Sequence, residues 1–443
     1  MASMAKSPAK TISPEQAAAL VGCGMWLDYG VALCQPDVFD RALAARVEEL
    51  RDVKIRSCLT MKPRAVLEAD PAGEHFHWLS WHFSGYDRRK HDSGIAHYIP
   101  LNLGEVPDYY RRFLDPVDIA ILKTCPMDQD GYFNFSAANL WHRAVVESAK
   151  VVIVEVTRGL PYAHGDRNGV HVSEVDYVIE GDDAPGAELL NPPPSEADRA
   201  VARLIAAEID DGACLQIGIG AMPNAVCQLL IQSGVRDLGI HTEMLIDGLV
   251  DLYAAGCVTG ARKALDPAKV VYTFSLGTRR MYDAIHRNPD FRCNPVEYTN
   301  SPHMIMRNDR VFSINSTTQI DLQGQAASES DGHRHLSGTG GQLQFVRGAY
   351  ASRGGKSFLC LSSTYEKHGR RRSRIVLNLT PGNIVTTPRS DVMYVVTEYG
   401  ITNLKGKSVA DRARALIALA HPDFRDELQR QAHENHLLPF YRD

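Results

Sequence analysis

The sequence predicts an α/β fold built from two related halves. The clearest observation is a short apolar run at residues 213–217, which breaks into the small-residue turn Gly218-Ile219-Gly220. Pro223 then opens an apolar helix that Gly234 ends, and a second apolar run follows at 238–240. Strand, turn, helix and strand in this order predict a βαβ unit. Its two strands should be parallel, because such crossovers are almost always right-handed.

The N-terminal half shows the same order of elements. Residues 26–29 indicate a strand, 30–35 a turn, and 53–59 a further strand. Between them Pro36 starts a helix whose apolar residues recur at helical spacing: Phe39, Leu43, Val47 and Leu50. The repeated order suggests two related α/β halves.

Other elements of this half follow from a cap and from apolar runs. Ser13 and Gln16 have the spacing of a capping box, which predicts a helix that continues to Val21. The runs at 117–122 and 151–156 are typical of buried parallel strands. The N-terminal half therefore has enough strands for a sheet of its own.

The clearest boundary in the chain is the proline run that begins at Pro192. Three successive prolines can continue neither a helix nor a central strand. With 443 residues and 44% hydrophobic side chains, the chain is long enough to fill two cores. We therefore predict an N-terminal α/β domain over residues 1–190, a linker over 191–196 and a C-terminal α/β domain over 197–443.

Composition argues against several classes of function. A net charge of −5 gives no basic surface for nucleic acid. The nine cysteines include no CxxC pair, which indicates reduced thiols rather than a disulfide framework or a zinc ribbon. No apolar run approaches the ~20 residues of a membrane span. We expect a cytoplasmic protein that binds neither nucleic acid nor membranes.

Glu243 is the candidate reactive residue because of its place after the second strand of the βαβ unit. His241-Thr242-Glu243 follow that strand directly. The glycine turn and Glu243 should therefore both lie at the carboxyl edge of the sheet, where open α/β sheets bind ligands. A glutamate in such a place is more often solvated or a helix cap, so its role depends on its surroundings.

The glycine turn is a candidate ligand-binding segment. Its backbone N–H groups can approach a phosphate or a pantetheine-like chain at a helix N-terminus, although a purely structural turn would have the same composition. Pro223 and Asn224 stand where a dinucleotide-binding fingerprint needs its third glycine. The turn therefore indicates a ligand other than NAD.

A second glycine-rich stretch lies in the C-terminal half. Residues 337–342 and 352–356 precede an apolar run at 357–361. Such glycine density lets backbone donors reach a ligand, or it forms turns only. Further on, residues 391–397 indicate a buried strand, and Ser408 caps an apolar-faced helix.

Six segments together are similar to a known family over nearly the whole chain. They are GIGAMPNAV at 218–226, GIHTEMLIDGLVDL at 239–252, DLQGQAASE at 321–329, GTGGQLQFVRGA at 338–349, GGKS at 354–357 and TPRSDVMYVVTEYGITNLKGKS at 387–408. The chain resembles the acetyl-CoA hydrolase/transferase family. Within that family it resembles the 4-hydroxybutyrate, butyryl and itaconate CoA-transferases.

The resemblance implies a fold and roles for particular residues. The fold would be two tandem NagB/RpiA/CoA-transferase-like open α/β domains with the active site between them. Glu243 would be the nucleophile that becomes a glutamyl-CoA thioester, and Gly341 would be a catalytic backbone donor. The residues that contact CoA would be Gly218, Ile219, Gly220, Ala221, Met222, Gly340, Gly341 and Lys356.

The resemblance also implies the substrates. These would be an acyl-CoA and a small carboxylic acid, either 4-hydroxybutyrate, butyrate or acetate, or itaconate or succinate. Coenzyme A would be a substrate, with no tightly bound cofactor and no metal. The protein would be a homodimer or a larger homo-oligomer.

The residue types suit this chemistry. A carboxylate can attack an acyl-CoA carbonyl to give a mixed anhydride, and the expelled thiolate then converts the anhydride to an enzyme thioester. Every step places negative charge on a carbonyl oxygen. Backbone N–H donors at Gly340 and Gly341 could therefore each contribute about 3–4 kcal/mol.

The chain departs from the family pattern at three places, which leaves the acyl specificity open. The N-terminal turn has a single glycine, Gly30, Gln344 replaces an acidic residue, and Asp130 stands where histidine is frequent. A second carboxylate on the substrate would need a cationic partner. The candidates are Arg64, Arg88, Arg89, Lys90, Arg279 and Arg347.

Three other functions remain open. An acyl-CoA hydrolase would use the same Glu243 but admit water. A metal hydrolase would use His75 and His77 on one face of a strand together with His82, although no HExxH pattern accompanies them. A non-catalytic CoA-binding role would fit if Glu243 lay far from every glycine turn.

Overall fold

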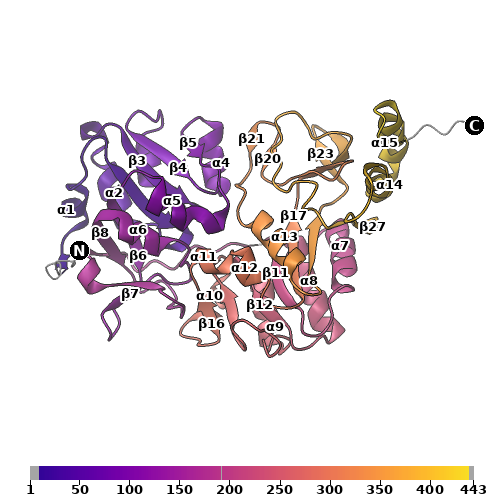
Figure 1. The fold of residues 1–443 in the computed structure, drawn as a ribbon. Helices are drawn as coiled ribbons and strands as arrows, with labels where there is room; N and C mark the ends of the chain where they lie inside the picture. The colour runs from indigo at the N-terminus through magenta and orange to yellow at the C-terminus, as the bar shows by residue number, and fades with distance from the viewer. Residues whose placement is uncertain (1–8, 191, 439–443) are drawn as a thin grey trace, which may run out of the picture. The chain divides into compact units, whose positions relative to one another are not determined.

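A computed structural model describes residues 9–190 and 192–438 (Figure 1). The chain forms two compact units. The first contains the residues up to 189 together with 271–299, and the second contains residues 190–270 together with those from 300 onward. Each unit is built around a mainly parallel sheet flanked by helices, so the predicted α/β fold class, with an open sheet in each half, is confirmed.

The first unit has a sheet in the order β1-β10-β8-β6-β2-β3-β4-β5, and all of its neighbouring strands are parallel. The strands are β1 (Lys10–Thr11), β2 (Trp26–Val31), β3 (Val53–Cys58), β4 (Phe76–Ser80), β5 (Ala96–Tyr98), β6 (Val117–Thr124), β8 (Ala149–Val156) and β10 (Tyr177–Glu180). An antiparallel hairpin joins β7 (Tyr132–Asn134) to β9 (Gly169–His171). The predicted strands of this half are thus present, each with limits shifted by a few residues at most.

Short helices connect these strands. They are α1 (Pro14–Ala18), α2 (Val38–Ala44), α3 (Ala65–Ala69), α4 (Gly85–Asp92), α5 (Val106–Arg112) and α6 (His142–Ser148). Single 3₁₀ turns occupy Ala32–Cys34, Val47–Glu49, Leu103–Glu105 and Val172–Glu174. Residues 270–299 form β14 (Val270–Tyr272), β15 (Phe274–Ser275), α10 (Arg279–Ile285), β16 (Phe291–Cys293) and α11 (Val296–Thr299), and β14 and β16 are not strands of the first unit's sheet.

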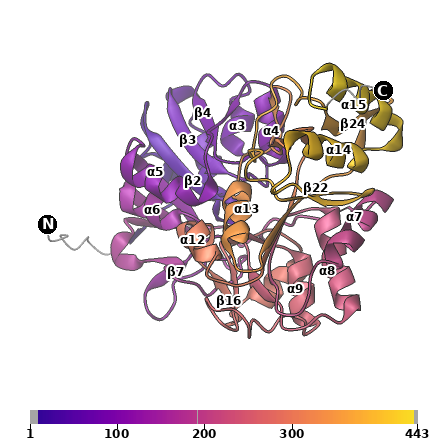
Figure 2. The ribbon, with the colours of Figure 1, turned by 45° about the vertical axis from the view of Figure 1, so that its right-hand side comes forward.

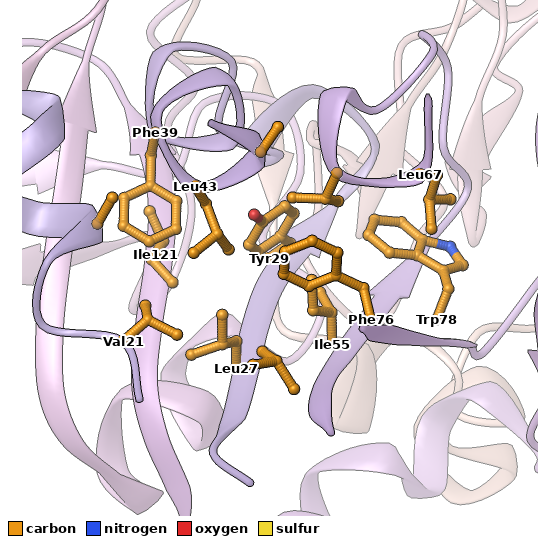
Figure 3. Close-up of a cluster of buried hydrophobic side chains, with 14 of the residues drawn as sticks. Val21, Leu27, Tyr29, Phe39, Leu43, Ile55, Leu67, Phe76, Trp78 and Ile121 are labelled. Atoms are coloured by element: carbon orange, nitrogen blue, oxygen red, sulfur yellow. The ribbon is translucent and has the colours of Figure 1, made fainter. Parts of the chain in front are cut away.

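The core of the first unit lies between the central strands and the helices that follow them (Figure 3). Tyr29 of β2 meets the rings of Phe39 and Trp78 edge-on, with ring centroids 6.1 Å and 5.8 Å away. Burying large aromatic side chains supplies much of the apolar area that stabilises such a core. Other side chains of the cluster in Figure 3 are Val21, Leu27, Leu43, Ile55, Leu67, Phe76 and Ile121.

Two predicted helices of this half are shorter than the sequence suggests, and Arg46 lies where each of them ends. Its guanidinium donates to the carbonyl oxygens of Ala18 and Val21, the second at 3.0 Å. These bonds supply partners for backbone carbonyl groups that α1 leaves without one at its C-terminal end. Arg46 itself leaves the helical conformation, with φ −102° and ψ 15°. The helix predicted from Pro36 onward therefore stops at Ala44. The predicted capping box at Ser13 is confirmed.

The second unit contains the strand order β12-β11-β17-β22-β26-β27. All of these pairs are parallel except β26 with β27. The strands are β11 (Cys214–Ile217), β12 (Gly239–His241), β17 (Val311–Ser316), β22 (Lys356–Cys360), β26 (Tyr394–Thr397) and β27 (Gly400–Asn403), and β13 (Met244–Leu245) follows β12. Smaller sheets join β18 (Gln319–Asp321) to β19 (Ala326–Ala327) and β25 (Ile375–Val376), β20 (Ser330–Asp331) to β21 (Arg334–His335), and β23 (Thr364–Lys367) to β24 (Arg370–Ser373).

Helices lie on both sides of this second sheet, as Figure 1 and Figure 2 show. On one side are α7 (Glu196–Ala206) and α8 (Ala221–Ser233), and on the other are α12 (Pro302–Ile305) and α13 (Gln342–Ala351). Phe345 of α13 and Ile305 of α12 pack on Cys214 of β11 and Val311 of β17. The remaining helices are α9 (Asp247–Ala254), α14 (Val409–Leu419) and α15 (Pro422–Glu434).

The predicted βαβ unit is confirmed. β11, α8 and β12 follow one another, and β11 pairs with β12 in parallel register. Gly234 ends α8 with φ +75°, a left-handed conformation that a glycine adopts without strain. The Ser408 cap of α14 is also confirmed, since its side chain accepts from the Asp411 N–H. The strand predicted at 391–397 begins only at Tyr394, because its first residues turn back to the Pro388 carbonyl.

The domain limits predicted from the proline run stay a prediction. Ser195 at the end of the run caps α7 through a capping box with Asp198. The chain passes from the first unit to the second at residues 189–190, and it returns to the first unit over 271–299. The sequence analysis predicted one contiguous segment for each domain, and it did not predict that residues 271–299 return to the first unit.

Three general expectations can be compared with the described part of the chain. All nine cysteines are free thiols, and Cys23 is the exposed one among them. Across residues 9–190 and 192–438, no helix combines the length and apolar content needed to span a bilayer. Within the same residues, no group of three or more His, Cys, Asp and Glu side chains is arranged to hold a metal ion.

Candidate active site

Glu243 lies at the carboxyl edge of the second sheet. It follows β12 after Thr242 and precedes β13. β12 lies beside β11 with Cys214 opposite Gly239 and Leu215 opposite Ile240. The glycine turn that follows β11 and the glutamate that follows β12 therefore emerge at the same edge, where open α/β sheets bind ligands.

Two groups hold the carboxyl of Glu243. The Asn300 side chain donates from Nδ2 to Glu243 Oε2 at 2.5 Å, and the backbone of Gly341 forms a hydrogen bond to the same carboxyl group. A Cβ atom on residue 341 would lie 2.1 Å from Glu243 Oε2 and 2.2 Å from Asn300 Nδ2. Only glycine lets the backbone approach the carboxyl this closely.

The surroundings of Glu243 adjust its protonation. Burial raises the pKa of Glu243 to about 7, while the bonds from Asn300 and Gly341 partly oppose the rise. A substantial fraction of the carboxyl is therefore ionised at neutral pH. It is also more basic than an ordinary glutamate, and a carboxylate in this state can act as a nucleophile.

Asn300 is a site residue that the sequence analysis missed. Its side chain is fully buried, and its Oδ1 atom has no hydrogen-bond partner among the described residues. In the sequence it precedes Ser301 and Pro302, a composition typical of a turn before a helix. The pattern around Asn300 thus predicts a turn and gives no indication of chemistry.

The glycine loop before α13 supplies the contact with Glu243. Gly340 has φ +59°, in the left-handed region, and Gly341 is the residue that precedes the first turn of α13. Both glycines are buried. Of the two predicted donors, Gly341 is the one that the structure brings to the carboxyl.

The glycine turn after β11 forms the N-terminus of α8. Gly220 has φ +126°, which an L side chain would make strained, and no side chain caps the helix. Gly218 continues the ladder by donating to the Ile314 carbonyl at 2.9 Å, and Ile219 is half exposed. With Ala221 and Met222, these residues offer backbone donors and the positive end of a 13-residue helix to a ligand.

Lys356 lies at the opposite edge of the sheet from the other predicted site residues. It is the first residue of β22, which runs parallel to β17 and β11, and Cys360 at the carboxyl edge lies four positions further along the strand, about 13 Å away. Its Nζ atom donates to Glu208 Oε2 at 2.7 Å. The structure therefore does not bring Lys356 together with Glu243, because the first residue of a strand lies at the amino edge of the sheet.

The other polar candidates take partners of their own. His75 Nδ1 lies 2.9 Å from the Leu50 carbonyl oxygen, and His77 lies 3.3 Å from Asp52, so the two histidines do not converge on one point. Four of the candidate cations form ion pairs within their own units: Arg64 with Asp37, Lys90 with Glu68, Arg279 with Asp283 and Arg347 with Asp391.

Comparison with known proteins identifies the family. Models of the N-terminal and C-terminal domains of acetyl-CoA hydrolase/transferase match residues 2–189 and 277–432. The chain belongs to this family. It is 44% identical to the butyryl-CoA:acetate CoA-transferase of Anaerostipes caccae over 96% of both chains. The predicted resemblance is thus confirmed.

Two further relatives extend the comparison. The chain is 43% identical to the 4-hydroxybutyrate coenzyme A transferase of Clostridium kluyveri, over 81% of this chain and 82% of that one. The crystal structure of RipA from Yersinia pestis superposes with a TM-score of 0.88 at 37% identity, over 97% of this chain and 98% of the other. The similarity in sequence and in fold therefore covers both halves.

Proposed function

We propose that the protein is a CoA-transferase that moves CoA from an acyl-CoA to a small carboxylic acid through a thioester on Glu243. One observation carries the proposal. A half-buried carboxyl at the carboxyl edge of a parallel sheet is held between an amide donor, Asn300, and a glycine backbone, Gly341. Family membership supports the reaction type.

The first half-reaction forms the enzyme thioester in two steps. A carboxylate oxygen of Glu243 attacks the carbonyl carbon of the acyl-CoA. The carbon–sulfur bond then breaks, which releases the CoA thiolate and forms an acyl-glutamyl anhydride. The thiolate then attacks the glutamyl carbonyl carbon, and the acyl group departs as its carboxylate. The second carboxylic acid reverses both steps on the enzyme thioester.

The residues around Glu243 have separate tasks in this scheme. Asn300 orients the carboxyl so that its nucleophilic oxygen is presented in one direction. The Gly341 N–H can donate to an oxygen that gains negative charge, and one such donor is worth roughly 3–4 kcal/mol of barrier. Because Gly341 has no side chain, the acyl and thioester groups can reach the same space.

The turn from Gly218 to Met222 is the proposed binding segment for the CoA chain. Its exposed Ile219 offers an apolar contact. The N-terminus of α8 offers N–H donors and a positive dipole to amide oxygens or phosphate. Gly340 would complete this contact by holding the loop that carries Gly341, whereas Lys356 is left out because it lies at the other edge.

The proposed substrates are short aliphatic acids and their CoA esters, with butyrate, acetate and 4-hydroxybutyrate as the first candidates. The names of the similar proteins support this choice. Itaconate or succinate would add a second carboxylate, and four of the six candidate cations for it are already in ion pairs. A panel of CoA esters against carboxylic acids measures the preference directly. The expected cytoplasmic location and homo-oligomeric state stay predictions.

Hydrolysis of acyl-CoA is the alternative activity, and it would use the same glutamate. In that case water rather than a carboxylic acid would attack the enzyme thioester. The rate of free CoA release with and without acetate separates the two activities. A transferase releases CoA only slowly in either condition and forms acetyl-CoA when acetate is added.

Covalent trapping tests the mechanism. Butyryl-CoA supplied without an acceptor should leave CoA attached to Glu243, and borohydride or hydroxylamine followed by mass spectrometry should locate the modification in the peptide with His241 to Met244. Adding acetate before trapping should prevent it. Initial rates should follow ping-pong kinetics with parallel double-reciprocal lines. Intersecting lines together with an unmodified Glu243 would contradict the proposal.

A further inference from the structure

Side chains from two other segments hold the glycine loop that meets Glu243. Thr339 and Gln342 flank the loop on either side of Gly340 and Gly341. The Thr339 hydroxyl donates to Glu329 Oε2 at 2.8 Å. On the other side, Gln342 Nε2 donates to the hydroxyl oxygens of Ser328 and Thr387, each at 2.9 Å.

Glu329 is at the centre of this arrangement. It is buried, and its second carboxylate oxygen, Oε1, accepts the Thr386 hydroxyl at 3.0 Å. Its backbone carbonyl accepts the Leu336 N–H at 2.7 Å. One residue therefore joins the start of the glycine loop to the segment that contains Thr386.

The backbone fixes these segments to one another as well. Ala326 and Thr387 exchange two hydrogen bonds of 3.1 Å each, from N–H to carbonyl in both directions. Ser328 and Glu329 follow Ala326 closely in the chain, and Thr386 adjoins Thr387. The residues that bond to Thr339 and Gln342 thus lie on two backbone segments that are hydrogen-bonded to each other.

A carboxylate suits this position better than a neutral side chain. It only accepts hydrogen bonds, so two hydroxyl groups that meet it must both donate, which fixes their orientation. Hydrogen bonds to a charged acceptor are shorter and stronger than neutral ones. Thr339 is held in this way directly before Gly340, where the chain adopts a φ of +59°.

We propose that Glu329 is a positioning residue, which acts through Thr339 to set the Gly341 backbone against the carboxyl of Glu243. The inference deepens the proposed function and rests on it. Glu329 does not touch the reacting atoms in this scheme. Its importance comes from the close approach of Gly341, where a Cβ would lie only 2.1 Å from Glu243 Oε2 and a small displacement of the loop alters the contact.

The sharpest test is a pair of variants at one position. Thr339→Val keeps the shape of the side chain and removes the hydroxyl, whereas Thr339→Ser keeps the hydroxyl. We expect Thr339→Val to lower kcat for butyryl-CoA and acetate by roughly 10- to 100-fold, because a misplacement near 1 Å can cost about that much. The KM for butyryl-CoA should stay within about twofold, since the turn that binds CoA is untouched.

Companion variants separate positioning from stability. Thr339→Ser should restore kcat to near the wild-type value. Glu329→Gln should lower kcat by a smaller factor than Thr339→Val, because an amide still offers one acceptor oxygen. Ser352→Ala removes a buried hydroxyl that bonds to the Asn308 carbonyl at the other end of α13. It should reduce thermal stability while kcat per folded enzyme stays unchanged.

The outcomes distinguish this inference from the proposed function. If wild-type enzyme forms the Glu243 thioester but Thr339→Val and Glu329→Gln keep the wild-type kcat, the positioning role is wrong and the transfer mechanism stands. If wild-type enzyme never forms the thioester, the proposed function fails whatever the variants do. Should Thr339→Val fail to fold, Glu329→Gln and Thr386→Val carry the same test. An equal loss of kcat in Thr339→Ser and Thr339→Val would also overturn the role of the hydroxyl.

Discussion

The two halves of the protein each place a glutamate near the carboxyl end of a parallel strand, yet the two carboxyl groups have very different surroundings. Glu155 is the last residue but one of β8 in the first unit and is fully buried. Its oxygens accept the N–H groups of Asp37 at 2.8 Å and of Val38 and Phe39 at 3.1 Å, which are the first donors of α2. Its carboxyl is fully used in capping a helix.

Glu243 has the same kind of position in the second unit but a more open environment. It is only half-buried, and its contacts are one amide donor from Asn300 and one backbone bond from Gly341. Burial raises the pKa of both carboxyl groups, and for Glu243 the value reaches about 7. The difference lies in the number of backbone donors: Glu155 accepts three N–H groups at the start of α2, whereas Glu243 takes a single backbone bond from Gly341 at the start of α13 and so keeps acceptor capacity for chemistry.

The largest effect should follow from removing the carboxyl of Glu243. Glu243→Ala should abolish CoA transfer, since neither anhydride nor thioester can form. Glu243→Asp should lower kcat for CoA transfer about a hundredfold, because shortening the side chain withdraws the carboxylate by about 1 Å. Transfer from butyryl-CoA to acetate measures both, with melting temperature and CoA binding as controls for the fold. Turnover retained in Glu243→Ala would sink the mechanism.

A side chain at position 341 should produce the next largest effect. Gly341→Ala should lower kcat by about 10²–10³-fold, as expected for the loss of one oxyanion donor, because the new Cβ would displace the loop or the carboxyl. Gly340→Ala meets strain at φ +59° one residue away from the group that bonds to Glu243, so its loss of kcat should be smaller. Equal losses in the two variants would mean that the loop acts only as a turn.

The pH dependence of thioester formation should report the pKa of Glu243. The ionised carboxylate is the reactive form and its pKa is about 7, so the single-turnover rate should be nearly constant above pH 8 and fall about tenfold per unit well below pH 7. Asn300→Ala removes a bond that lowers this pKa, so the fall should move to higher pH. A profile for Asn300→Ala that overlays the wild type would show that Asn300 does not interact with the carboxyl.

Glu155→Gln should change stability and leave the chemistry intact. The substitution replaces one acceptor oxygen at the start of α2 by a donor that faces backbone N–H groups. We expect a loss of about 1–3 kcal/mol in the free energy of unfolding. Denaturant titration measures that loss, and kcat per folded enzyme should remain within about threefold. A large fall in kcat with unchanged stability would mean that the two glutamates are less different than their surroundings indicate.

The smallest effect should come from Lys356→Ala. Its ammonium group pairs with Glu208 at the amino edge of the sheet. The KM for butyryl-CoA should therefore change by less than about twofold, and the half-exposed ion pair should contribute at most about 1 kcal/mol to stability. A tenfold rise in KM, accompanied by a weaker dependence on salt, would restore the contact with CoA that the family resemblance implies.

Interactions between residues close together in the chain account for the local elements and their order. The βαβ unit, the caps at Ser13 and Ser408 and the end of α8 at Gly234 all follow from interactions within a few residues, and the structure has them. The position of Glu243 at the carboxyl edge follows as well, because the handedness of the crossover leaves one arrangement. The amino-edge position of Lys356 could also have been inferred, since it directly precedes the strand predicted at 357–361.

The surroundings of the Glu243 carboxyl depend on contacts between distant parts of the chain. Asn300 lies 57 residues further along the chain, and its own neighbourhood indicates only a turn. Glu329 and Thr386, which hold the glycine loop, are likewise separated by 57 residues. No local periodicity encodes such contacts, because they arise when separate strands and loops converge at one edge of a sheet. For the same reason the sequence could not distinguish Glu155, whose oxygens are filled by a helix N-terminus, from Glu243, whose carboxyl remains available for chemistry.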